Sequence, residues 1–165
     1  MKKLFVLAAI ITALYGLTAC GDEENSDGTP SVTEEIRGVA WKLYGYGTVK
    51  DAHFHIVEPK LIRGSLEDQM WGDRFVITFN TDGTITGVTA ANELHGEYII
   101  MGDKIKIIRL VRDKGGEPDV YDEDAELFFH ALGRIDNEPY EVKNGQFILY
   151  YNSQQEYLQF YRKES

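Results

Sequence analysis

The sequence has one cysteine, a shortage of basic side chains and no long apolar run beyond its first residues. Its 165 residues include 17 Lys and Arg against 27 Asp and Glu, which gives a formal net charge of −10. This balance argues against nucleic acid as a partner, because a phosphate backbone needs compensating Lys and Arg. A single cysteine offers no intramolecular disulfide, so an apolar core must hold the fold. The hydrophobic content of 43% is ordinary for a globular domain with such a core.

The one cysteine, Cys20, follows two lysines near the start and an apolar segment over residues 4–16. This segment is shorter than the roughly 20 residues that a membrane-spanning helix needs, and it is typical of a secretory signal peptide. The residues Leu17-Thr18-Ala19-Cys20 resemble the bacterial lipobox, in which the cysteine becomes the acylated first residue. We therefore predict a lipoprotein signal peptide over residues 1–19 and a lipid anchor on Cys20 that attaches the protein to a membrane. The alternative is a plain exported protein with an incidental cysteine.

Residues 20–35 are predicted to form an acidic flexible tether, because residues 21–35 contain six acidic side chains and no basic one. Gly21 follows the cysteine, so the usual aspartate signal for inner-membrane retention is missing. The acids Asp22-Glu23-Glu24 resemble the signal that sends some Gram-negative lipoproteins to the outer cell face, although they also fit a plain spacer. We expect an outer-membrane lipoprotein of a Gram-negative cell, with surface exposure slightly favoured over a periplasm-facing position.

Residues 36–165 are predicted to form a single mainly β domain with about eight strands. Two hairpin turns are expected, at Thr81-Asp82-Gly83 and at Asn152-Ser153. Within residues 104–111 the apolar pattern changes phase, which predicts a β-bulge or a strand buried on both faces. The expected strands cover residues 39–46, 74–80, 84–89, 95–100, 104–111, 146–151 and 156–162.

One helix is predicted late in the chain, over residues 122–134. Its apolar residues Ala125, Phe128, Phe129 and Leu132 recur at the spacing of one helix face. Asp122 is expected to cap the helix start, and Gly133 is expected to end it in the left-handed conformation. The whole pattern predicts an α+β fold in which an antiparallel curled sheet or small barrel carries one packed helix.

Several of these segments together resemble META/HslJ-like domains. The first strand carries a Trp-x-Leu opening, and the stretch FNTDGTITGVTAANELHGEY over residues 79–98 resembles the central signature of that family. The resemblance extends over residues 39–162, and its signature residues are Trp41, Leu43, Gly87, Asn92, Gly96 and Tyr98. It implies a small β-rich domain of cell-envelope proteins, frequently lipoproteins, with no agreed enzymatic activity and no cofactor.

The sequence departs from this family in its cysteines. Many members carry a cysteine before the signature Asn and another before the helix, whereas this chain has Ala90-Ala91-Asn92 and no second cysteine. From their residue types, Gly87 and Gly96 indicate close backbone approach, and Asn92 indicates a turn. A catalytic role for the Asn92 amide is the alternative, although Ala90 and Ala91 supply no acid, base or nucleophile.

The sequence contains none of the common catalytic motifs, so we predict no enzymatic activity, no cofactor and no metal site. His53 and His55 would share one face of a strand and could begin a metal pair, but no third ligand is evident beside them. Residues 23–34 approximate a calcium loop, yet Glu23 replaces the usual first aspartate and Pro30 interrupts the loop. Calcium binding by the acidic clusters stays an open alternative.

Three tyrosines form the predicted interaction surface: Tyr150, Tyr157 and Tyr161. Tyr157 and Tyr161 lie on the strand face opposite Leu158 and Phe160, so they point outward if the latter pair faces the core. Exposed tyrosines are frequent at protein and sugar interfaces, although cross-strand aromatic pairing within the sheet is the alternative.

These observations together predict a lipid-anchored cell-envelope protein. Its domain is expected to serve non-enzymatic binding, interaction or envelope support, with an unknown protein or glycan as partner. The alternative is a small-ligand carrier or hydrolase that uses the concave side of the sheet.

Surface display has a direct test on intact cells. An antibody against the folded domain, or an added protease, should reach it without permeabilisation, because an anchor in the outer leaflet leaves the domain outside the cell. Protection until the cells are permeabilised would instead place the domain in the periplasm and would make Asp22-Glu23-Glu24 a spacer.

Overall fold

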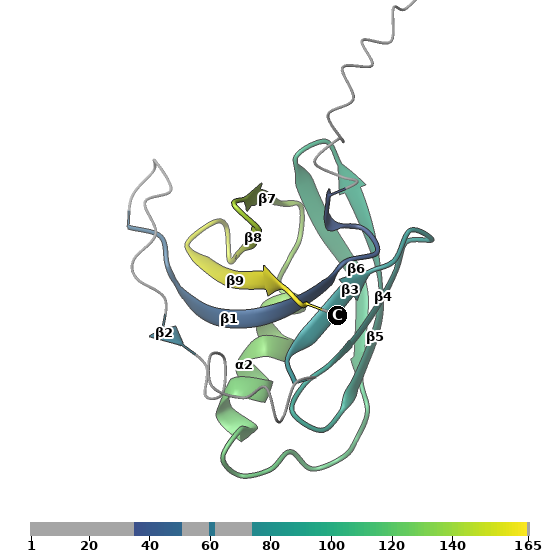
Figure 1. Ribbon diagram of the computed structural model, residues 1–165, viewed down its shortest axis with the longest axis vertical. Helices are drawn as coiled ribbons and strands as arrows, with labels where there is room; N and C mark the ends of the chain where they lie inside the picture. The colour runs from purple at the N-terminus through teal and green to yellow at the C-terminus, as the bar shows by residue number, and fades with distance from the viewer. Residues whose placement is uncertain (1–34, 51–59, 62–73, 165) are drawn as a thin grey trace, which may run out of the picture.

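A single antiparallel sheet that closes on itself dominates the computed structural model, which describes residues 35–50, 60–61 and 74–164 (Figure 1). The strand order is β2-β1-β3-β4-β5-β6-β7-β8-β9, and β1 also pairs with β9, so eight strands form a ring with the short β2 beside β1. The mainly β fold with one late helix is therefore confirmed. The elements are β1 (Ala40–Thr48), β2 (Lys60–Leu61), β3 (Val76–Phe79), β4 (Thr84–Val88), β5 (Glu93–Met101), β6 (Lys104–Arg112), α2 (Asp122–Leu132), β7 (Glu138–Lys143), β8 (Gln146–Tyr151) and β9 (Glu156–Arg162).

Aromatic rings fill the interior of this ring of strands. Phe147 lies at their centre, with its ring centroid 5.1 Å from that of Trp41, 5.8 Å from that of Phe79 and 5.4 Å from that of Phe160. All four side chains are fully buried. Alternation along each strand sends these residues inward because successive side chains point to opposite faces of a sheet. The barrel therefore encloses a packed core at this level.

The helix α2 packs its apolar stripe onto that core. Phe128 is fully buried, and its ring centroid lies 5.9 Å from that of Phe75 and 6.2 Å from that of Phe160. The predicted helix face is confirmed for Ala125, Phe128 and Leu132, which are all buried, whereas Phe129 is only partly buried.

Both predicted helix caps are wrong. The N-cap is Tyr121 and makes no side-chain capping bond, while Gly133 has a right-handed φ of −67°. The helix ends without a left-handed residue because the chain continues in a tight turn, with the Ile135 N–H donating to the Leu132 carbonyl. This turn carries Ile135 into the core, where it is 1% exposed.

The change of phase within β6 is a β-bulge, as predicted. Glu97 pairs with Arg109 while the next residue, Tyr98, pairs with Ile107, so Ile108 is an extra residue on β6. Ile107 is buried and Ile108 is 54% exposed. The extra residue restores the inward direction for Leu110, which packs partly against the core.

Strand β7 was not predicted, because its sequence EPYEVK contains a proline and three charged residues. Pro139 cannot donate to a ladder and occurs at strand starts or edges. Here it is the second residue of β7, paired with Lys104, and β7 meets β6 at only two register positions. The two predicted hairpin turns are confirmed, with Gly83 at φ +86° and Asn152 at φ +54°.

Gly87 provides a test of the close approach between β3 and β4. A Cβ at this position would lie 2.5 Å from the Val76 carbonyl oxygen and 3.2 Å from Ile77 Cα. We expect Gly87→Ala to lower the free energy of unfolding by about 1–3 kcal/mol, because backbone atoms must move to admit the methyl group.

The matched control is Gly116→Ala, since a Cβ there meets no atom within 4 Å. It should change the free energy of unfolding by less than about 0.5 kcal/mol in urea titrations. Equal stability of the two variants would contradict the close-approach role of Gly87.

Candidate functional site

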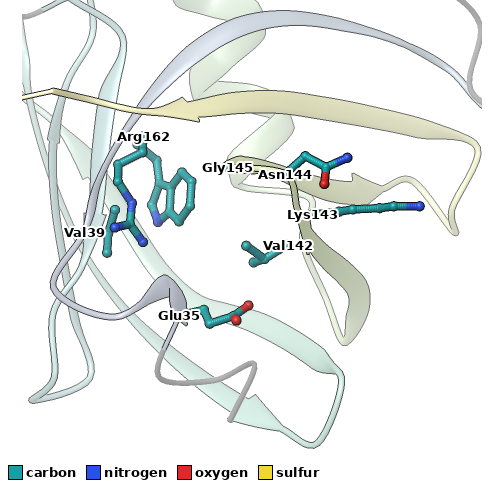
Figure 2. A pocket seen from close by; sticks show the side chains of 8 residues that line it. Glu35, Val39, Val142, Lys143, Asn144, Gly145 and Arg162 are labelled. Atoms are coloured by element: carbon teal, nitrogen blue, oxygen red, sulfur yellow. The ribbon is translucent and has the colours of Figure 1, made fainter. Parts of the chain in front are cut away.

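The first candidate site is a groove of about 420 Å³ at one end of the barrel (Figure 2). Sheet closure assembles it, because Trp41 of β1 pairs with Arg162 of β9 and the Arg162 N–H donates to the Gly145 carbonyl. Figure 2 shows Val39 and Arg162 on one side of the groove and the turn between β7 and β8 on the other. The lining residues are Glu35, Val39, Trp41, Val142, Lys143, Asn144, Gly145 and Arg162.

The indole of Trp41 forms the base of this groove and is not itself an exposed contact surface. It is 0% exposed, and its N–H donates to the Ile36 carbonyl oxygen over 3.1 Å. The Arg162 guanidinium lies 6.0 Å from the indole centroid, a cation–π contact that holds the arginine at the rim. Trp41 therefore links the segment before β1 to the end of β9, beside the groove.

The groove combines a few apolar groups with charges of both signs. Val39 and Val142 supply apolar surface, Glu35 supplies a carboxylate, and Lys143 and Arg162 supply cations. Its eight lining residues include no serine, cysteine or histidine that could act as a nucleophile or general base. Such a lining can hold a polar ligand or a segment of a partner.

A second polar cluster surrounds the signature residue Asn92. The side-chain amide of Asn92 donates to Glu117 Oε1 over 2.7 Å, and the Ala91 N–H donates to Glu117 Oε2 over 2.9 Å. The Thr89 hydroxyl also donates to this carboxylate. Thr89 and Asn92 are 0% and 3% exposed. The carboxylate thus bonds the β4–β5 turn to the segment after β6, an arrangement that fits a structural role.

Glu117 was missed by the sequence analysis, which considered only Ala90 and Ala91 beside Asn92. The two residues are 25 positions apart, and only the path of the chain after β6 brings them together. The same close approach leaves no room for a side chain at Gly115, since a Cβ there would collide with the Asn92 side-chain oxygen. Glycine next to a buried polar side chain marks this close approach.

The other signature residues lie in the barrel wall and core. Trp41 and Leu43 are fully buried, and Tyr98 is 3% exposed with its hydroxyl donating to the Asn80 carbonyl over 2.7 Å. Gly87 and Gly96 each face a backbone carbonyl of the neighbouring strand at close range. The structure brings none of these five residues together with Asn92 into one cleft among the described pockets.

The predicted tyrosine surface requires correction. Tyr161 is 37% exposed, but Tyr150 and Tyr157 are only 2% and 0% exposed and cannot form an open interaction surface. Tyr157 is directly paired with Gly47, so the absent side chain lets the phenol lie against strand β1. Tyr150 is paired with Tyr157 and donates to Glu141 over 3.0 Å. The cross-strand pairing that the sequence analysis kept as an alternative is what these two residues form.

Several predicted features fall outside the described residues, namely Cys20, the acidic tether before residue 35, and the pair His53 and His55. Among the residues that the structure does describe, no group of three or more His, Cys, Asp or Glu is placed to hold a metal ion. Within the same residues, no helix has both the length and the apolar character needed to cross a membrane.

The described chain thus belongs to the class of closed antiparallel β-barrels with one packed helix, and solved structures share this architecture. A DUF4847 family protein from Bacteroides vulgatus ATCC 8482 matches with a TM-score of 0.58 at 19% identity, over 82% of this chain and 100% of that one. A protein from Burkholderia xenovorans matches with a TM-score of 0.56 at 15% identity, over 81% of this chain and 87% of that one. No family model and no curated protein matches the chain. The likeness shows the mainly β fold.

The buried tyrosines predict a loss of stability at alkaline pH. Burial raises the pKa of Tyr151 to about 12, and burial together with the nearby Glu141 carboxylate raises the pKa of Tyr150 above its usual value. A pKa that is higher in the folded state means that the neutral phenol stabilises the fold. This contribution is complete below about pH 10 and is lost as the pH rises towards the folded value.

We therefore expect the free energy of unfolding to fall between pH 10 and 12, with about 2–3 kcal/mol from Tyr151 alone. Urea titrations at pH 8, 10 and 11.5 measure this loss, and absorbance near 295 nm reports tyrosinate formation. Tyr151→Phe should reduce the alkaline loss. An identical loss in the native protein and in this variant would count against a neutral buried Tyr151.

Proposed function

We propose that this chain is a lipid-anchored cell-envelope protein, attached through Cys20, whose β-barrel is a non-enzymatic binding module. The lipobox-like residues and the resemblance to META/HslJ-like domains support the envelope location, and the mainly β fold is consistent with that family. The partner that we propose is a protein or a glycan of the envelope. The residues after the cysteine support an outer-membrane position, with the outer cell face slightly favoured over the periplasmic side.

The filled interior of the barrel is the observation that carries a surface-binding role. A barrel that carries a small ligand needs a lumen, whereas here Phe147 and its neighbouring rings occupy the centre. Ile36 and Phe128 are both fully buried against the same core. This packing favours binding on the outside over the alternative of a carrier or hydrolase that uses the concave side of the sheet.

The groove between Arg162 and the β7–β8 turn is the proposed contact site. Asn144 and Gly145 have φ values of +54° and +74°, and this tight turn holds Lys143 and Asn144 at the rim. The groove also lies beside Glu35, the first described residue. If Cys20 is the anchor, the fifteen residue-to-residue steps from Cys20 to Glu35 reach at most about 50 Å, so this end of the barrel stays near the membrane surface.

Site-specific photo-crosslinking tests this proposal in living cells. A photoreactive amino acid at Asn144 should give a discrete adduct with an envelope component, whereas the same probe at Thr81, an exposed turn residue outside the groove, should not. Charge reversal with Lys143→Glu, which leaves the contact between Arg162 and Trp41 in place, should reduce the adduct severalfold without changing the melting temperature. Adducts of equal yield at both positions, or none at Asn144, would contradict the groove as contact site.

The anchor is tested separately with Cys20→Ser. The native protein should partition into the detergent phase of a phase-separating nonionic detergent, and the variant should stay in the aqueous phase because it lacks acyl chains. Identical partitioning of the two proteins would overturn the lipid anchor while leaving the groove proposal intact.

A further inference from the structure

Strand β6 has an edge that its neighbour in the barrel does not cover. β6 runs to Arg112, but β7 pairs with it only at Lys104 and Ile105. Beyond these positions, in the part of the chain that the structure describes, the one backbone hydrogen bond recorded on this edge joins the Ile107 N–H to the Ile135 carbonyl. The ring is closed through the β6–β7 pairing, but among the described residues no strand pairs with the later part of β6 on the side of α2.

The direction of the free backbone groups follows from the ladder with β5. The Asp113 N–H donates to the Glu93 carbonyl, so this pair faces β5. Because hydrogen-bonded pairs alternate in an antiparallel ladder, the N–H and C=O groups of Leu110 and Arg112 point away from β5, toward the open edge. Two residues thus present strand-pairing groups at a position where a further strand would lie.

A groove of about 260 Å³ lies along this edge, with α2 as its other wall. The wall is held in place because Arg112 Nη2 lies 2.5 Å from Glu126 Oε1 and the same guanidinium lies 4.8 Å from the Phe129 ring centroid. Ile108, displaced outward by the bulge, adds exposed apolar surface at the rim. The full lining is Ile107, Ile108, Arg109, Leu110, Phe129, His130, Gly133 and Arg134.

The charge of this groove is opposite to that of the whole chain. Arg109, Arg134 and His130 line it, and no acidic residue is among its lining, although the chain has a net charge of −10. The nearby carboxylate of Glu126 is already engaged by Arg112 and by His130 Nε2 at 3.3 Å. The neighbouring Asp136 is paired with Lys106 at 2.7 Å. Glu97 lies opposite Arg109 in the ladder, and Glu156 lines a neighbouring pocket together with Arg134, so both arginines also have a carboxylate of the chain nearby. The charged residues that line the groove itself are basic, which makes an acidic segment the complementary ligand.

We propose that the groove between β6 and α2 binds an extended acidic peptide of a partner protein, which adds as a strand to the edge of β6. Main-chain hydrogen bonds to Leu110 and Arg112 supply the pairing, and Arg109 and Arg134 select acidic side chains. Figure 1 shows α2 at the end of the barrel away from residues 35–38, where the first groove lies. The two sites are separate, so this inference goes beyond the proposed function and does not depend on it.

A designed peptide tests this inference directly. The probe is a fluorescein-labelled hexapeptide of alternating Glu and Val, titrated with the full-length chain in detergent micelles and followed by fluorescence anisotropy. We expect saturable binding that weakens as salt rises. The matching Lys–Val hexapeptide should not bind. No saturable binding of the Glu–Val peptide, or equal binding of both peptides, would overturn the proposal.

Protein variants locate the site. Arg109→Glu together with Arg134→Glu should weaken binding at least tenfold, while Lys143→Glu at the other end of the barrel should leave it within twofold. Equal effects of these two changes would show a general electrostatic attraction and would overturn the assigned groove. Retained melting temperatures identify the variants that are folded.

N-methylation of the peptide distinguishes binding by strand addition from binding by charge attraction alone. This test requires no change in the protein. Along a strand, alternate residues direct their N–H groups to opposite edges. Methylation of one alternate set of nitrogens should abolish binding, and methylation of the other set should be tolerated. Equal affinity of the two methylated peptides would exclude strand addition.

Discussion

The pairing of the first strand with the last is the constraint on which the rest of this structure depends. β1 and β9 pair from Trp41 and Arg162 to Thr48 and Glu156, with one irregularity near Tyr44. This ladder converts a meander of neighbouring hairpins into a closed ring and leaves the core without an open sheet edge at the chain ends. It also sets the fully buried Trp41 at the base of the first groove and places Gly47 against Tyr157.

The packed aromatic core leaves the outside of the barrel as the place for the proposed binding sites. The aromatic side chains that stabilise the closed sheet also occupy the space that a ligand would need, so the two proposed surfaces lie where strands end or lose a neighbour. One lies at the barrel mouth, where the chain enters β1 and leaves β9. The other lies where β6 extends beyond its pairing with β7 and α2 lies beside it instead of a strand. Both follow from unequal strand lengths in a closed sheet.

Much of the fold was predictable because its signals are local. Apolar alternation predicted the strand within residues 74–80, the stripe of Ala125, Phe128 and Leu132 predicted the helix, and a change in the alternation indicated the bulge in β6. The strand and the helix end that were not predicted correctly share one cause, since tertiary contacts outweigh the local sequence signals in both. β7 contains Pro139 and weak apolar alternation, yet tertiary pairing with β8 makes it a strand. The helix ends without a left-handed residue because Ile135 packs into the core. No capping residue in the sequence indicates this.

The sequence by itself determined the strands with clean alternation, the apolar helix face and the turn glycines, since each depends on residues a few positions apart. The tertiary structure alone decided which surfaces exist. Tyr150 and Tyr157 alternate as an outward pair would, and they are buried because their neighbours across the sheet leave room for them. The Glu117 clamp and the basic groove beside α2 join residues that are distant in the chain. Each depends on where the folded chain places distant segments, and no local pattern contains that information.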